Sequence, residues 1–169
     1  MLALFQTFLD IIRLRKGPDA IPYSWIVCFI TLTLWLLAGL AITVTTDGMN
    51  DRDFLNGTFT GVVGLACYAA VVVSHGHTPR LLQTVTAVLG CGALISFLFL
   101  ASSAVLGTVL QQTTVQLVGT LILLWSVPVE GHIIARAIDR PWFVGIVMAI
   151  AVFIVQLYLY AYLDPDAVG

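Results

Sequence analysis

The residues of this sequence that could carry chemistry are concentrated in one stretch, which runs from Trp125 to Arg136 and reads WSVPVEGHIIAR. The stretch contains Glu130, the only acid inside a long apolar run, together with Pro128 and His132. At 1.5 Å of rise per helical residue, Glu130 would lie about 9 Å deeper than Arg136, and His132 about 6 Å deeper. A titratable side chain at such a depth in a membrane is costly and by default indicates a functional site.

Two further histidines could complete a polar site around Glu130. Glu130 and His132 are two residues apart, so on an ideal helix they point about 200° away from each other. They cannot form a ligand pair of the i, i+4 type. A histidine that contacts Glu130 must therefore come from another helix, and the candidates are His75 and His77.

Several roles remain open for these residues. Pro128 leaves the carbonyl group of Leu124 without its helical donor, so this carbonyl and Glu130 could form a polar pocket. Glu130 could instead only reach the interface, or neutralise Arg80, Arg136 or Arg140. It could also serve a proton-linked or ion-conducting role, or help to recognise a lipid or partner headgroup. A metal or haem site would use the histidines at one membrane face, which are His75, His77 and His132.

Motifs of catalysis are missing from the sequence. It has no Gly-rich phosphate loop, no nucleophile elbow, no HExxH and no acid pair of catalytic spacing. We therefore expect no enzyme, no cofactor and no resident metal ion. The three cysteines, Cys28, Cys67 and Cys91, fall inside apolar runs without CxxC spacing, and we expect them to be small buried side chains.

The elements that must position these residues are membrane helices. The chain has 169 residues, of which 60% are hydrophobic and only 9% charged, whereas a soluble domain carries about 25% charged residues. Five runs are long enough to cross a hydrocarbon core, which needs about 20 apolar residues per helix. They lie at about 23–44, 55–74, 81–105, 114–137 and 142–163. The sequence predicts an all-α integral membrane protein, in which a bundle of five transmembrane helices forms a single membrane domain over residues 1–169.

An amphipathic helix is predicted before the first span, over residues 2–15. Gln6, Asp10 and Arg13 share one helical stripe, and apolar side chains cover much of the rest. We expect this helix to lie in the headgroup plane. It ends at a Gly-Pro pair that follows a basic cluster of Arg13, Arg15 and Lys16.

The distribution of charge predicts the orientation of the chain, because basic residues collect on the cytoplasmic side. With five spans, one side receives Arg13, Arg15, Lys16, Arg80, Arg136 and Arg140. The other side keeps Arg52 together with Asp47, Asp51, Asp53, Asp164 and Asp166. We expect the basic residues to contact lipid headgroups and to fix a cytoplasmic N-terminus and a periplasmic C-terminus. The basic cluster is too small to indicate nucleic-acid binding.

Small residues on three of the spans predict close helix contacts. They are Gly57, Gly61 and Gly64 on the second span, Gly90 and Gly92 on the third, and Gly145 and Ala149 on the fifth. These glycine-rich faces could bind a protein partner or a second copy of the chain. Trp35 and Trp125 fall near mid-span, and we expect them to pack at helix contacts.

Two stretches carry a resemblance to a known family: DIIRLRKGPDAIPYS at 10–24 and LLWSVPVEGHIIARAI at 123–138. With the five-helix plan, they resemble the small bacterial inner-membrane proteins grouped with the Yip1 family. Eukaryotic members of that family are multi-span proteins of membrane traffic that work through protein partners. The resemblance implies a non-enzymatic interaction or accessory subunit in a bacterial inner membrane. The residues also leave open a small transporter or proton-linked permease that uses Glu130, and a haem- or metal-binding subunit of a redox complex.

Overall fold

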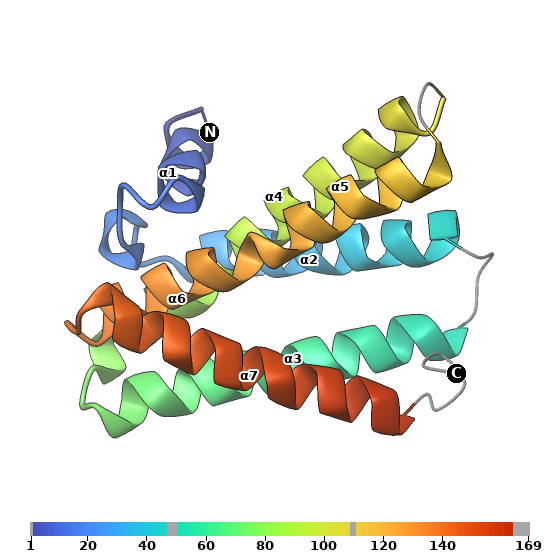
Figure 1. The fold of residues 1–169 in the computed structure, drawn as a ribbon. Coiled ribbons are helices and arrows are strands. Elements are labelled where there is room, and N and C mark those ends of the chain that lie inside the picture. The colour runs from blue at the N-terminus through green and yellow to red at the C-terminus, as the bar shows by residue number, and fades with distance from the viewer. Residues whose placement is uncertain (1, 47–50, 109–110, 164–169) are drawn as a thin grey trace.

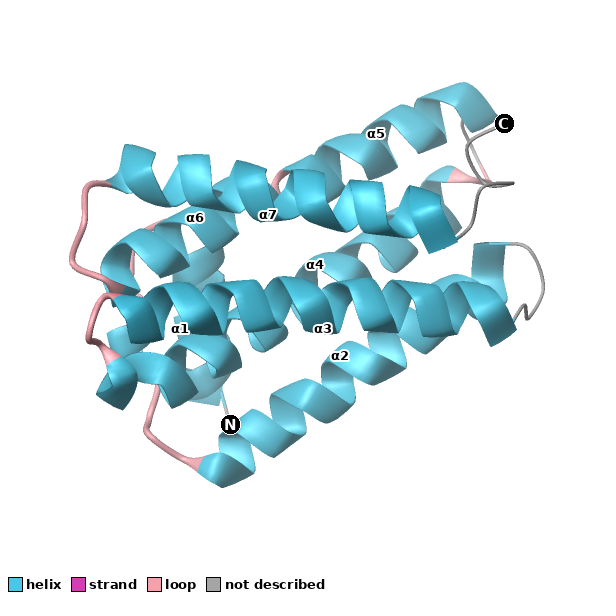
Figure 2. Ribbon diagram, turned by 90° about the horizontal axis from the view of Figure 1, so that it is seen from below, coloured by secondary structure: helices cyan, strands magenta, loops and turns pink. Residues whose placement is uncertain are grey.

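The computed structural model describes residues 2–46, 51–108 and 111–163, and within them the fold is all-helical (Figure 1). The α-helices are α1 (Leu2–Ile12), α2 (Trp25–Thr46), α3 (Asp51–Ser74), α4 (Leu81–Leu106), α5 (Gln112–Leu124), α6 (Ser126–Ala137) and α7 (Trp142–Leu163). Two short 3-10 helices, η1 (Pro18–Ala20) and η2 (Thr78–Arg80), precede α2 and α4. Figure 2 shows that most connections lie at the two ends of the bundle.

Five helical segments are long and apolar enough to cross a membrane. They are Trp25–Thr45, Arg52–Ser74, Thr78–Leu106, Thr113–Ala137 and Trp142–Leu163. Each begins within a few residues of a predicted span, because a continuous apolar run in a chain with few charges leaves the helix as the only way to pair its backbone groups in lipid. The predicted all-helical fold with five helices of membrane-spanning length is confirmed.

The fourth of these segments consists of two helices. α5 ends at Leu124 and α6 begins at Ser126, with Trp125 between them. Pro128 explains the interruption, because it has no amide hydrogen to donate to the carbonyl group of Leu124 and its ring crowds the preceding turn. As a result α5 runs beside α4, whereas α6 packs along α7 (Figure 1).

Helix α4 is the central element, since α2, α3, α5 and α6 all pack against it. One core cluster joins α1, α4 and α6 and contains Phe8, Ile11, Ile21, Ala87, Cys91, Ile95, Val129 and Ile133. A second cluster joins α3, α6 and α7 and contains Tyr68, Val72, Ile134, Ala137, Ile138 and Val152. Helix α6 therefore contributes to both clusters, which places the stretch around Glu130 between them.

Helix α1 lies across the direction of the long helices, near the end of the bundle where α2 begins (Figure 1). The predicted N-terminal helix is thus present, although it ends at Ile12. Part of its apolar surface is covered by protein, because Phe8 and Ile11 are buried against α4 and α6, whereas Phe5 is 48% exposed.

The glycine-rich faces are filled mainly from within the chain. The ring of Trp35 lies against Gly61, and the ring of Phe8 lies against Gly90. On α7, Gly145 touches the carbonyl group of Gly131. Trp35 therefore packs at a helix contact as predicted.

Candidate functional site

Glu130 is hydrogen-bonded to a tyrosine of another helix. The hydroxyl group of Tyr68, on α3, donates to Oε2 of Glu130 over 2.6 Å, a short distance for an O–H···O bond. Tyr68 is only 2% exposed, and Glu130 is partly buried. The bond ties α3 to α6 through a carboxyl group within a segment of membrane-spanning length.

The two candidate histidines have other partners. Nδ1 of His75 lies 2.9 Å from the carbonyl oxygen of Val71 in its own helix. Nε2 of His77 lies 3.3 Å from Oδ2 of Asp139. Neither of these histidines is the partner of Glu130 in the structure, because both follow the end of α3 and Glu130 lies deeper in the bundle.

Depth along the helices could have identified Tyr68. α3 and α6 end on the same side of the bundle, at Ser74 and Ala137. Tyr68 is six residues before the first of these ends, and Glu130 is seven residues before the second. A residue that can reach Glu130 from α3 must lie at this depth. Tyr68 is the polar side chain there, and we did not single it out because it is uncharged.

No basic residue neutralises Glu130 among the residues that the structure describes. Nη1 of Arg80 instead lies 2.8 Å from Oδ2 of Asp139. The same nitrogen also donates to the carbonyl groups of Arg136 and Ala137, both at 3.3 Å, at the end of α6. The alternative in which Glu130 only balances an arginine is therefore not realised.

Asp139 accepts contacts from His77 and Arg80, and these three residues, which we call the polar clasp, connect the α3–α4 turn to the α6–α7 turn. Asp139 has a left-handed backbone conformation, with φ 52°, directly after the end of α6. The hydrogen bond from Arg80 is the main cause that lowers the pKa of Asp139, and His77 acts in the same direction. The clasp joins residues that are far apart in the sequence at the end of the bundle where most basic residues lie.

His132 binds the N-terminal segment and not Glu130. Its Nε2 lies 3.0 Å from the carbonyl oxygen of Lys16, and the residue is 7% exposed. The side chain of Gln83, on α4, donates over 2.6 Å to the carbonyl group of Ile21 in the same segment. A side chain of α4 and one of α6 therefore fix the turn that leads from α1 into α2.

The C-terminal end of α1 has all its carbonyl groups satisfied by protein. The last four carbonyl groups of a helix have no partner within it. Those of α1 accept hydrogen bonds from the amides of Arg13, Leu14 and Arg15 and from the indole nitrogen of Trp125, which lies 3.2 Å from the oxygen of Ile12. Leu14 takes the left-handed conformation, φ 61°, that such a cap requires. This helix end needs no water.

The two stretches that carry the family resemblance thus contact each other. Trp125 binds Ile12, and His132 binds the carbonyl group of Lys16. A Cβ on Gly17 would lie 3.1 Å from Cβ of Arg136, which is tighter than an ordinary van der Waals contact, so the glycine favours this close approach. Two polar side chains of the 125–136 stretch, Trp125 and His132, therefore bind the protein's own backbone.

A metal centre has no support in the described part of the chain. There, no group of three or more His, Cys, Asp or Glu side chains is close enough together to hold a metal ion. His75, His77 and His132 each have a separate partner, as described above. Of the three free cysteines, Cys91 is buried, as predicted, whereas Cys28 and Cys67 are partly exposed.

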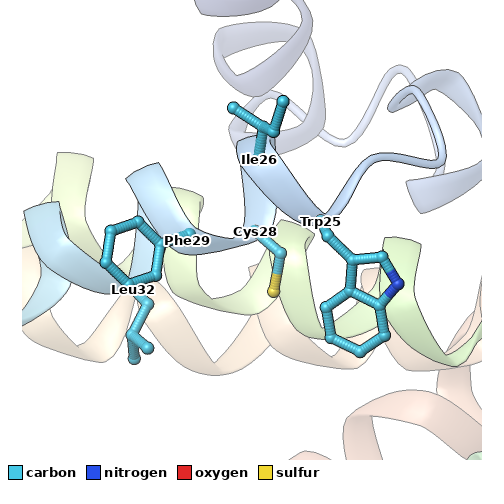
Figure 3. A pocket seen from close by; sticks show the side chains of 5 residues that line it. All are labelled: Trp25, Ile26, Cys28, Phe29 and Leu32. Atoms are coloured by element: carbon cyan, nitrogen blue, oxygen red, sulfur yellow. The ribbon is translucent and has the colours of Figure 1, made fainter.

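A hollow of about 490 Å³ lies on α2 (Figure 3). It is lined only by side chains of this helix, namely Trp25, Ile26, Cys28, Phe29 and Leu32. The lining has no charged side chain, so the hollow suits an apolar group.

Comparison with protein-family models, with curated proteins and with solved structures finds no match to this chain.

Proposed function

We propose that this chain is a multi-pass protein of a bacterial inner membrane that acts without catalysis, as an interaction or accessory subunit of a membrane assembly. The observation that supports this most directly is the outer face of α2. Trp25, Ile26 and Phe29 are 72%, 73% and 69% exposed and surround the hollow. Apolar side chains face lipid anywhere on such a protein, but aromatic residues around a hollow are typical of protein interfaces.

The occupant we propose for the hollow is an apolar helix of a protein partner. Trp25, Cys28, Phe29 and Leu32 recur at the spacing of one helical face. The small side chain of Cys28 lies between larger ones, which leaves room for a side chain of a facing helix. Aromatic anchors next to such pockets commonly supply most of the binding energy of an interface.

The glycine-rich faces give less support to partner binding than expected. Gly61, Gly64 and Gly90 meet side chains of the same chain, and Gly145 meets the backbone of α6. Gly57 is the exception on α3, with nothing within 4 Å of its Cβ position. For this reason we assign the partner surface to α2.

The charge distribution supports a cytoplasmic N-terminus and a periplasmic C-terminus. The contacts of Arg80 with Asp139 and of Arg136 with Gly17 bring basic residues together at the end where α2 begins. Arg52 lies near the start of α3, at the opposite end. Asp47, Asp164 and Asp166, which entered the same argument, lie outside the described residues.

The test is purification from native membranes in a mild detergent, followed by identification of any stoichiometric partner. Phe29→Ala should reduce the retained partner about 30-fold, the equivalent of a hot-spot loss of about 2 kcal/mol. Phe143→Ala is the matched control, because Phe143 is 65% exposed on α7 and does not line the hollow. A partner that is retained equally by both variants would contradict the assignment to α2, and a chain that purifies alone would contradict the accessory role.

A small transporter or proton-linked permease is the second candidate function. Its support is Glu130, a carboxyl group near the break between α5 and α6 that has Tyr68 as its partner and no basic residue, within the described part of the chain. Ionisable groups near broken helices are typical of transport sites.

The permease is tested by flux into liposomes. Glu130→Gln should abolish the flux and leave folding intact, and Tyr68→Phe, which keeps the carboxyl group, should change it less. Flux that is unchanged in Glu130→Gln, or absent from the wild type, would remove this candidate.

A further inference from the structure

The turn after α1 displays two arginines, Arg13 and Arg15, that form no ion pair with a described residue. Nζ of Lys16 lies 2.8 Å from Oδ2 of Asp10, and this contact is the main cause that lowers the pKa of Asp10. Arg13 and Arg15 are exposed, and neither has a carboxylate at ion-pair distance among the described residues. Lys16 is therefore satisfied internally, whereas the two arginines are available.

A third arginine joins this turn from the other end of the sequence. Arg136 is exposed on the last turn of α6, and its Cβ lies close to Gly17, as described above. Like the other two, it forms no ion pair within the described part of the chain. The aliphatic part of the Arg136 side chain thus lies beside Gly17, which is buried in the turn that carries Arg15.

The backbone that presents these arginines is fixed. His132 holds the carbonyl group of Lys16, and Leu14 is in the left-handed conformation. The amides of Ala20 and Ile21 close the following turn at 3.2 and 3.0 Å. Little backbone entropy is therefore lost when an anion binds, because the backbone of the turn is already ordered.

The local charge is positive. The carboxylates near the turn are Asp10, which is bound to Lys16, and Asp19, whose side chain approaches Gly17. Four basic side chains (Arg13, Arg15, Lys16 and Arg136) therefore face two acidic ones. An anion is attracted to this turn.

The position of the turn indicates which anion is available. Tyr23 and Trp25, which follow the turn, are 65% and 72% exposed. Such amphipathic aromatic residues are enriched at the level of lipid headgroups. Helix α1 lies across the bundle at the same end (Figure 1), which is the orientation of a helix in the plane of the interface.

We propose that Arg13, Arg15 and Arg136 bind the phosphate group of an anionic phospholipid. The planar guanidinium groups match phosphate oxygens through paired hydrogen bonds. The three arginines do not line the hollow on α2, so their binding of phosphate can be tested separately from the partner surface.

The experiment is native mass spectrometry of the purified protein after incubation with phosphatidylglycerol or with phosphatidylcholine. The wild type should retain phosphatidylglycerol in preference. Arg15→Gln and Arg136→Gln should each reduce its occupancy about fivefold, and the double variant about 25-fold, as expected for charges near a lipid surface. Arg52→Gln, at the opposite end of the bundle, is the matched control and should change nothing.

Three results would overturn the site. They are equal retention of the two lipids by the wild type, undiminished phosphatidylglycerol on the double variant, and an equal loss in Arg52→Gln. Because the three arginines are exposed, folding should persist, and gel filtration of each variant checks this. Arg136→Lys adds a further test, because lysine keeps the positive charge but lacks the planar guanidinium that forms paired hydrogen bonds with phosphate. The amount of phosphatidylglycerol bound to Arg136→Lys should therefore fall between the amounts bound to the wild type and to Arg136→Gln.

Discussion

The contact between α6 and α7 depends on two glycines whose backbones touch. A Cβ on Gly131 would lie 2.9 Å from both N and Cα of Ile146, and 3.1 Å from the carbonyl carbon of Gly145. Carbon atoms in favourable contact are about 3.5–4.0 Å apart. The obstacles to Gly131→Ala are backbone atoms, so no side chain can rotate away and the two helices must separate by up to about 1 Å.

The expected magnitude follows from this overlap. Forcing an extra methyl group into a closely packed contact costs about 1–3 kcal/mol. Gly57→Ala on α3 is the matched control, since nothing lies within 4 Å of its Cβ position. There the substitution should stabilise the helix by about 1 kcal/mol. Both variants gain the same helix propensity, so they should differ by the packing cost alone, about 1–3 kcal/mol in the free energy of unfolding.

The assay is unfolding in detergent of the wild type and both variants, followed by helical circular dichroism. Gly131→Ala should unfold at a lower temperature or denaturant concentration than the wild type, and Gly57→Ala at the same value or higher. Because both changes are Gly→Ala within a helix, their difference removes the effect of helix propensity. A Gly131→Ala variant as stable as Gly57→Ala would refute the backbone contact between α6 and α7.

Three further predictions concern the N-terminal segment and the polar clasp. Because Arg80 lowers the pKa of Asp139 below its ordinary value of 3.8, the clasp stabilises the fold above that pH and is lost as pH falls through the lowered pKa. The unfolding midpoints of the wild type and Asp139→Asn should converge between about pH 5 and pH 2, and a constant difference would contradict this. Trp125→Phe removes the donor to Ile12 and should cost about 0.6–1.7 kcal/mol, measured as faster hydrogen exchange in α1; unchanged exchange would argue against the bond. Phe8→Ala removes a buried ring and should cost about 3–5 kcal/mol in the free energy of unfolding, so a loss below about 1 kcal/mol would contradict its core role.

Local rules predicted the candidate site in part. The depth of Glu130 and the missing donor at Pro128 follow from helical rise and from the proline ring, which act within one helix. The interruption of the fourth membrane-length segment at Trp125 agrees with the missing amide donor of Pro128. Tyr68 was missed, because its hydroxyl group adds no charge to an apolar run and its link to Glu130 crosses from one helix to another.

The roles of the basic residues also required the tertiary structure. The sequence assigned Arg13, Lys16 and Arg80 alike to headgroups and topology. The structure separates them, because Lys16 is bound to Asp10 and Arg80 to Asp139, while Arg13 forms no ion pair with a described residue. Only a neighbour brought close by folding can neutralise a charge, and charge counts along the chain do not contain that information.

The sequence by itself determined that this chain forms five helices of membrane-spanning length with an amphipathic helix before them. Those features depend on the length of apolar runs and on the need to pair every backbone group, and both are local. The tertiary structure alone decided that the apolar face of α1 packs on α4 and α6, that Gly61 and Gly90 meet aromatic rings of the same chain, and that His132 holds the N-terminal turn. The physical reason is that a long helix of membrane-spanning composition, such as α2 or α7, is apolar on all sides. Its sequence pattern therefore does not specify which face turns inward, and only packing between helices sets that rotation.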